Sequence, residues 1–313
     1  MKIVFMGTPD FAVPSLMKLY REGYAIQGVI TQPDRPKGRK KILEAPPVKQ
    51  AALKLGLPIY QPQSMKTEEA FQVVTQWSPD LIVTAAFGQI LPKHILDFPP
   101  LGAVNVHASL LPKYRGGAPV QRAIMNGERQ TGVTIMYMEE KLDSGPILSQ
   151  ASLPIQDEDD AGSLLAKLSE AGADLLIHTL GKLSAGTIQP QPQNEAEATY
   201  APLIRREDER IDWNKPARAI FNQIRGLRPH PGAFTVFGEQ NIKLWRAIES
   251  DASLLPDPPG TLFRLDKEGI GVVCGDGRGL IITELQPAGK KRMGAADFLR
   301  GLGQNWKIGE RLG

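Results

Sequence analysis

Two polar side chains interrupt an apolar run near the first third of the chain. In Ala103–His107 (AVNVH), Asn105 and His107 are two residues apart, so on a β-strand both side chains project from the same face. An amide and an imidazole that point into one site can polarise a carbonyl group and stabilise its oxyanion. The pair predicts transfer chemistry at a carbonyl, although a histidine and an asparagine that only satisfy nearby backbone groups would give the same pattern.

A carboxylate that could assist this pair follows the next predicted strand. Asp143 lies in Leu142–Gly145 (LDSG), just after Val133–Met138. A carboxylate beside an imidazole can orient the ring or accept a proton, whereas Asp-Ser-Gly is also an ordinary turn sequence. The intervening segment Ala108–Gly117 is long and ends in two glycines, which favours a loop that shapes a ligand site.

Other catalytic classes lack their characteristic residues. Cys274 is the single cysteine and Ser109 does not lie in a Gly-x-Ser-x-Gly elbow, so a covalent enzyme nucleophile has little support. The first strand is followed by Gly7–Asp10 (GTPD) and not by Gly-x-Gly-x-x-Gly, which argues against a nicotinamide cofactor. The four histidines are widely scattered, and we expect no metal site.

Alternating strands and helices must position these residues. The predicted strands are Lys2–Met6, Ala25–Ile30, Leu81–Ala86, Ala103–His107 and Val133–Met138. The predicted helices are Phe11–Glu22, Val48–Leu55, Glu68–Trp77, Pro119–Met125 and Ala161–Leu183. Such alternation implies an α/β fold class with a mostly parallel sheet.

The amino-acid composition changes after the last of these helices. Thr187–Pro202 contains three prolines and three glutamines without hydrophobic periodicity, which is typical of a linker. A helix is predicted at Pro216–Arg225. Five short strands follow, at Ala233–Phe237, Ile242–Ile248, Gly260–Leu265, Gly269–Cys274 and Leu280–Leu285. They predict a small antiparallel domain, for which an OB-like barrel is one candidate and a small sandwich is another.

Composition indicates a soluble globular protein, with 42% hydrophobic and 23% charged residues. No apolar run is long enough to span a membrane. The apolar run before Gly7 is too short for a signal peptide. We therefore expect a cytoplasmic location and no membrane partner.

The charge is unevenly placed. The formal net charge of +3 does not by itself indicate a polyanionic partner. Yet residues 32–49 carry six basic and two acidic side chains, and Gln286–Arg292 carries three basic side chains and no acidic one. Two solvated loops would explain this, but clustered Lys and Arg can also contact a phosphate backbone. The glycine and prolines of the first run predict a protruding loop.

Several segments together resemble one family. They are Asn105–Gly116 (NVHASLLPKYRG), Gly132–Ile135 and Leu142–Gly145. The chain resembles the folate-dependent formyltransferases in these segments. Five others narrow the resemblance to members that act on methionyl-tRNA: Met1–Leu16, Gln32–Arg39, Gln121–Ile124, Arg210–Trp213 and Leu285–Lys290.

The resemblance implies both architecture and partners. Residues 1–189 would form a Rossmann-like catalytic domain, 190–207 a linker and 208–313 an OB-like, tRNA-binding barrel. The formyl donor would be 10-formyltetrahydrofolate and the acceptor the α-amino group of initiator methionyl-tRNA. A monomer without a metal is expected.

The resemblance also implies residue roles. The catalytic residues would be Asn105, His107 and Asp143. Folate would be bound by Ser109, Leu110, Leu111, Pro112, Phe87, Gly88, Gln89, Ile90, Leu142 and Gly145. The loop Asp34–Lys49 would meet the tRNA acceptor stem, with Arg39 as its most important basic residue. The tRNA-binding side chains would be Arg35, Lys37, Arg39, Lys40, Lys41, Lys290, Lys291 and Arg292.

Three other functions remain open at this point. A formyltransferase for a sugar nucleotide or another small amine is one, but it would leave the basic loop and the barrel without a role. A hydrolase of formyltetrahydrofolate would need the same Asn-His-Asp set. A non-catalytic RNA-binding protein is disfavoured because all three of those residues are present.

Overall fold

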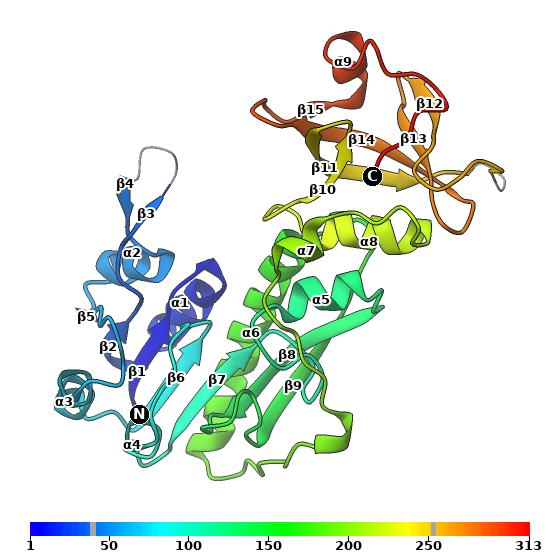
Figure 1. Cartoon of the computed structure of the whole chain (residues 1–313). Coiled ribbons are helices and arrows are strands. Elements are labelled where there is room, and N and C mark those ends of the chain that lie inside the picture. Colours follow the sequence, from blue (N-terminus) through cyan, green and yellow to red (C-terminus); the bar gives the residue numbers. More distant parts are fainter. Residues whose placement is uncertain (38–41, 252–254) are drawn as a thin grey trace. The chain divides into compact units, whose positions relative to one another are not determined.

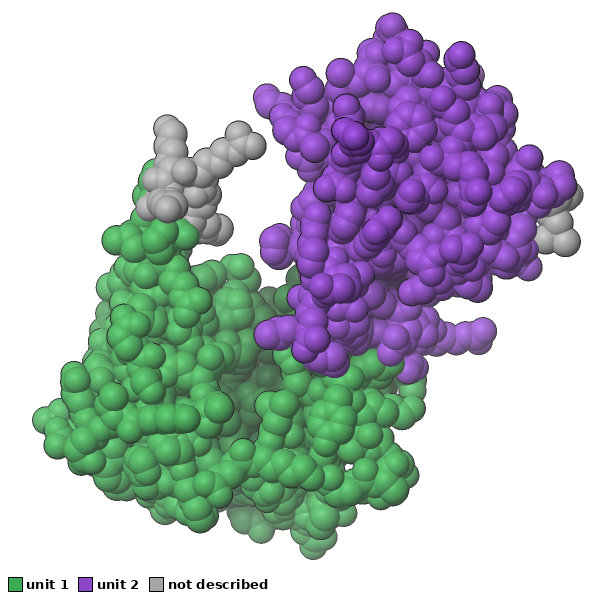
Figure 2. Space-filling model, viewed as in Figure 1, with its two compact units in different colours: residues 1–119, 130–154, 165–201 green, residues 120–129, 155–164, 202–313 purple. Residues whose placement is uncertain are grey.

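The computed structural model describes residues 1–37, 42–251 and 255–313 (Figure 1). Its contacts divide the chain into two compact units, which Figure 2 colours separately. Unit 1 contains Met1–Pro119, Gln130–Pro154 and Leu165–Ala201, and unit 2 contains Val120–Arg129, Ile155–Leu164 and Pro202–Gly313. Neither unit is one continuous stretch. Of the segment expected to be a linker, 190–207, residues 190–201 belong to unit 1.

A seven-stranded sheet forms the centre of unit 1. Its strands are β1 (Lys2–Gly7), β2 (Ala25–Ile30), β5 (Ile59–Tyr60), β6 (Leu81–Ala85), β7 (Ala103–His107), β8 (Gln130–Tyr137) and β9 (Ile147–Pro154). They lie in the order β5-β2-β1-β6-β7-β8-β9. The five strands from β5 to β7 in this order pair with one another in parallel, whereas the β7–β8 and β8–β9 pairs are antiparallel. This confirms the mostly parallel α/β fold. The sequence did not predict β9, because this edge strand is only half-buried and has no continuous apolar run.

Apolar strands and capped helices build the core of this unit. The helices are α1 (Val13–Arg21), α2 (Pro47–Lys54), α3 (Glu68–Trp77), α4 (Lys93–Leu96), α5 (Pro119–Met125) and α6 (Ala161–Ser184), of which α5 and the start of α6 reach into unit 2. At the start of α3 the Thr67 hydroxyl accepts from Ala70 N, and two glutamates complement the helix dipole. Ile3 to Met6 of β1 are fully buried, each stabilising the fold by about 1.5–3 kcal/mol.

Two short strands lie within the segment Asp34–Lys49 that was predicted to protrude as a loop. β3 (Arg35–Lys37) and β4 (Ile42–Glu44) pair antiparallel, with Arg35 opposite Glu44. Ile42 and Leu43 are 65% and 68% exposed, so the hairpin presents apolar as well as basic side chains. Residues 38–41 lie outside the described part of the chain.

Unit 2 contains an antiparallel sheet. Its strands are β10 (Ala233–Phe237), β11 (Gln240–Glu249), β12 (Leu262–Asp266), β13 (Gly269–Val273), β14 (Gly279–Pro287) and β15 (Met293–Gly294), and its helices include α7 (Arg206–Glu209), α8 (Ala217–Gly226) and α9 (Ala295–Arg300). The order β10-β11-β14-β13-β12, with β15 on β14, is consistent with the small barrel-like domain that was predicted. The helix and the five strands predicted here are all present, whereas β15 and α9 were not predicted.

Within the three described ranges, no helix is long and apolar enough to cross a membrane.

Candidate active site

Strand β7 carries two polar residues, Asn105 and His107. Asn105 pairs with Thr84 of β6 on one side and with Met136 of β8 on the other. The Thr84 hydroxyl donates to Asn105 Oδ1 at 2.7 Å, which fixes the amide and leaves its NH₂ group to donate elsewhere. The sequence did not single out Thr84, because its neighbour across the sheet is 21 residues away.

His107, at the end of β7, is held from two sides. Its Nε2 lies 3.1 Å from Tyr114 O, a carbonyl that can only accept, so Nε2 carries a hydrogen. Its Nδ1 lies 3.7 Å from Asp143 Oδ2, beyond hydrogen-bonding distance but close enough for an ion pair with a protonated ring. The two side chains are only 7% and 14% exposed. The structure therefore places His107 beside Asp143, with Asn105 two residues earlier on the same strand.

Backbone geometry fixes the turn that carries Asp143. Gly116 N donates to Asp143 Oδ2 at 2.8 Å, which orients the carboxylate. Asp143 has a φ of 47°, a left-handed conformation that aspartate tolerates better than most residues. At Gly145 a Cβ would lie 2.0 Å from Tyr137 O, so only glycine allows this close approach. The Asp-Ser-Gly sequence is thus both a turn and the support of a carboxylate.

The loop after β7 is anchored on β8 and β9. Thr134 Oγ1 donates to Ser109 O at 2.7 Å and accepts from Leu111 N at 3.1 Å. Gln150 Nε2 donates to Leu111 O at 2.8 Å. Ser109 and Leu111 are almost fully buried, whereas Leu110 and Pro112 are half-buried. Thr134 and Gln150 were missed by the sequence argument because nothing in their local pattern marks them.

The remaining residues predicted to bind folate differ in their surroundings. Phe87 is buried, and Gly88 has a φ of 82°. The Gln89 side chain bridges Met65 N and Pro62 O, so it holds its own loop. Ile90 and Leu142 are 70% and 60% exposed, which makes both apolar side chains available to a ligand.

A pocket of about 590 Å³ opens at the carboxyl ends of β1, β2 and β6. It is lined by Thr8–Asp10, Gln32, Pro33, Arg35, Pro36, Glu44–Pro47 and Ala86–Gly88. Open α/β sheets bind their ligands at this edge. Thr8 Oγ1 donates to Phe87 O at 2.9 Å and Gln32 Nε2 donates to the same oxygen at 3.3 Å, so the wall of the pocket is hydrogen-bonded. Phe87, Gly88 and Arg35 are the predicted site residues that line it.

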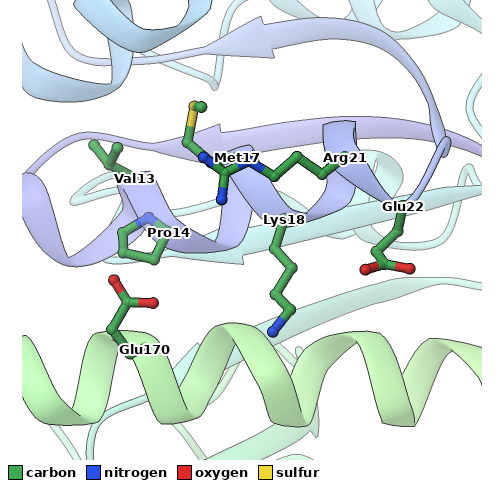
Figure 3. A pocket seen from close by; sticks show the side chains of 7 residues that line it. All are labelled: Val13, Pro14, Met17, Lys18, Arg21, Glu22 and Glu170. Atoms are coloured by element: carbon green, nitrogen blue, oxygen red, sulfur yellow. The ribbon is translucent and has the colours of Figure 1, made fainter.

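A second pocket, of about 410 Å³, lies between α1 and α6. Figure 3 shows Lys18 pointing from α1 toward α6, and Glu170 pointing back from α6. Lys18 forms an ion pair with Asp174. None of the predicted site residues lines this pocket.

The basic residues predicted to bind tRNA fall in both units. Arg35 is exposed and donates to Gln32 Oε1 at 3.3 Å, and Lys37 ends β3. Lys290 and Lys291 are exposed in unit 2. Arg292 is paired with Glu284, which lowers the pKa of that carboxyl. The three remaining predicted residues, Arg39, Lys40 and Lys41, lie outside the described residues.

The part of the chain that the structure describes contains no cluster of three or more His, Cys, Asp or Glu residues that could hold a metal ion.

Comparison with known proteins identifies two family matches. Residues 1–180 match the formyl transferase family, and residues 203–303 match the formyl transferase C-terminal domain. The methionyl-tRNA formyltransferase of Halalkalibacterium halodurans is 54% identical over 313 residues, covering 100% of this chain and 98% of the relative. That of Bacillus subtilis is 53% identical over 300 residues, covering 96% of this chain and 94% of the relative.

Two solved structures share the fold at lower identity. An N-formyltransferase from Helicobacter canadensis, in complex with folinic acid and dTDP-3-aminofucose, has a TM-score of 0.66 at 19% identity and covers 90% of this chain and 98% of its own. HypX from Aquifex aeolicus, in complex with tetrahydrofolic acid, has a TM-score of 0.64 at 18% identity and covers 100% of this chain and 50% of its own.

Proposed function

This chain belongs to the formyl transferase family, and we propose that it transfers the formyl group of 10-formyltetrahydrofolate to the α-amino group of methionyl-initiator tRNA. The product is N-formylmethionyl-tRNA for translation initiation. Identity of 54% over its full length to methionyl-tRNA formyltransferases supports this acceptor over a sugar nucleotide. The relatives cover both units, which supports a role for the barrel-like domain and the basic hairpin in the same activity.

The pairing of His107 with Asp143, and the position of Asn105 two residues before His107 on β7, support the mechanism. The neutral amine attacks the formyl carbon, a C–N bond forms, and the carbonyl electrons move to oxygen. The Asn105 NH₂ group and His107 Nδ1–H, the ring N–H that does not contact Tyr114, donate to this oxyanion. Asp143 stabilises the imidazolium and takes the proton from the attacking amine. Collapse breaks the bond to N10 of the folate, which receives that proton.

The other predicted residues have binding roles in this proposal. The loop Ser109–Pro112, the strand end Phe87–Ile90 and the turn Leu142–Gly145 hold the folate. Residues 1–189 carry the chemistry, and 208–313 bind tRNA together with the basic residues of the hairpin. Of the intervening segment 190–207, residues 190–201 belong to unit 1. The protein acts as a monomer in the cytoplasm.

The first prediction tests the catalytic assignment. His107→Ala should lower kcat by about 100- to 1000-fold, because one oxyanion donor is lost, and Asp143→Asn should abolish most of the transfer. The assay follows the mass of Met-tRNA during incubation with 10-formyltetrahydrofolate, with uncharged tRNA as the substrate control. His178→Ala, on an exposed position of α6, is the matched control and should behave as wild type.

Binding separates catalysis from folding in this experiment. Both variants should bind Met-tRNA with wild-type affinity, since neither residue is proposed to contact the acceptor stem. Near-wild-type turnover in either variant would refute its catalytic role. Consumption of the donor with no mass change of Met-tRNA in the wild type would instead identify a hydrolase.

A further inference from the structure

We propose that Gln193 and Arg115 are positioning residues that hold the Asp143 turn in its working geometry. Both belong to a hydrogen-bond network that includes residues 191–201, here called the strap. The whole strap falls in the segment whose composition is typical of a linker. The inference rests on the proposed function, because it assigns these residues a part in the use of Asp143. Neither residue is proposed to touch substrate.

The amide of Gln193 binds the backbone of the turn directly. Its Nε2 donates to Asp143 O at 2.9 Å and to Gly145 O at 2.8 Å. Both partners are carbonyl oxygens, which can only accept, so the amide orientation is fixed by its partners. The Gln193 side chain therefore binds the carbonyl groups of the residues before and after Ser144. The backbones of Gln191 and Ile147 also pair in both directions at 2.8 Å, which attaches the strap to the start of β9.

Arg115 orients this amide from the other side. Its Nε and Nη2 donate to Gln193 Oε1 at 3.1 and 2.8 Å, and its side chain is fully buried. Nη2 also donates to Glu195 Oε1 at 2.8 Å, while Lys141 Nζ donates to Glu195 Oε2 at 2.7 Å. The strap thus contacts the loop before Asp143 through Lys141, as well as the turn itself.

The same network also contacts the Asp143 carboxylate. Gly116, the residue after Arg115, donates its N–H to Asp143 Oδ2. Arg115 therefore acts on Asp143 twice: through the main chain, which places the Gly116 N–H, and through Gln193, which places the Asp143 backbone. A displacement of Gln193 moves the carboxylate relative to the N–H that orients it.

The strap also fixes the partner of His107. Thr199 Oγ1 accepts from Tyr114 N at 2.9 Å, and Thr199 O accepts from Arg115 N at 2.9 Å. Ala201 N in turn donates to Arg115 O at 2.7 Å. Since Tyr114 O receives the His107 Nε2 hydrogen, the strap positions both members of the His107–Asp143 pair.

The variant Gln193→Glu separates positioning from stability. A carboxylate keeps the acceptor for Arg115, and the resulting ion pair preserves the fold. It removes the donor, however, and places a charged oxygen against two carbonyl oxygens. We expect kcat to fall by about 10- to 100-fold, since an ångström of misplacement can cost that much. KM for folate and for Met-tRNA should stay within about twofold of wild type.

Gln191→Glu is the matched control. It makes the same change two residues away in the strap, on an exposed side chain that makes only a local contact with Gln189 O. It should show wild-type kcat. If Gln193→Glu does not give folded protein by circular dichroism, Gln193→Met, uncharged and of similar length, takes its place with the same expected loss.

A double-mutant cycle distinguishes positioning from a general structural defect. On the Asp143→Asn background, Gln193→Glu should lower the residual kcat by less than about twofold, because the carboxylate that it positions is already gone. Losses that multiply, a wild-type kcat for the single variant, or an equal loss in Gln191→Glu would each overturn the proposal. Wild-type turnover of Asp143→Asn alone would overturn the catalytic assignment instead.

Discussion

At the scale of single residues, the site depends on carboxylates whose roles are set by their donors. Asp143, which has a left-handed backbone conformation, accepts from a backbone N–H and faces an imidazole. Glu195 has a supporting role: Arg115 and Lys141 bind its two oxygens and lower its pKa to about 2. The first carboxylate is available for chemistry, and the second ties the strap to its neighbours.

Glu195 makes stability depend on pH. Its folded pKa of about 2 lies below its ordinary value of 4.5, so its contribution is fully present above that ordinary value and is lost as pH falls toward 2. We therefore expect Glu195→Gln to lower the melting temperature at pH 7. The difference between variant and wild type should shrink from pH 4.5 downward in thermal unfolding. An unchanged difference across this range would contradict the ion-pair assignment.

The residues that sequence reasoning found and missed differ in one physical respect. Asn105 and His107 were found because polar side chains on an apolar strand stand out locally. Gln193 carries no such signal, since its amide bonds to carbonyls 50 and 48 residues away. A low-complexity run of Pro and Gln has the composition of a linker, and only tertiary contacts reveal its role.

At the scale of elements, the connections between strands determine the geometry of the site, and they are harder to predict from sequence than the strands themselves. Helical spacing predicted α3 with its observed bounds, because its buried residues Ala70 and Val74 are four apart, and a short apolar run between turn residues predicted β10 with its observed bounds. These patterns missed β9 and the β3–β4 hairpin, whose exposed positions give no apolar pattern. The Asp-Ser-Gly turn between β8 and β9 was recognisable in the sequence, but only the pairing of the strands shows that it brings Asp143 to the end of β7.

Two glycine substitutions test the importance of that turn. Gly145→Ala would place a Cβ against Tyr137 O and should destabilise the protein by about 1–3 kcal/mol, as overpacking does. It should also lower kcat, because the Asp143 turn must shift. Gly181→Ala, in α6 where a Cβ meets nothing within 4 Å, should stabilise by about 0.5–1 kcal/mol. Urea unfolding of both variants measures the contrast, and equal effects would refute the steric argument.

At the scale of the whole molecule, the placement of charge matters more than its sum. A formal net charge of +3 conceals exposed basic side chains in each unit. Arg292 is already paired with Glu284, so within its basic run Lys290 and Lys291 are better able to contact phosphates.

The salt dependence of Met-tRNA binding tests whether Lys290 and Lys291 contact phosphates. Lys290→Ala combined with Lys291→Ala should weaken Met-tRNA binding and reduce the slope of log K against log salt by about one for each lysine that contacts a phosphate. Lys267→Ala, exposed at the β12–β13 turn, is the control and should leave the slope unchanged. Filter binding at several salt concentrations gives the slopes, and a wild-type slope in the double variant would rule out these contacts.

The interleaved units have a consequence for synthesis of the chain. Unit 2 includes residues 120–129 and 155–164, yet Arg122 pairs with Asp208 and Asp160 with Arg228, up to 86 residues later. At ribosomal rates of about 5–20 residues per second, Asp208 is synthesised roughly 4 to 17 s after Arg122. The early segments of unit 2 thus leave the ribosome well before their partners, so unit 2 cannot form these ion pairs until residues after the end of unit 1 have been synthesised.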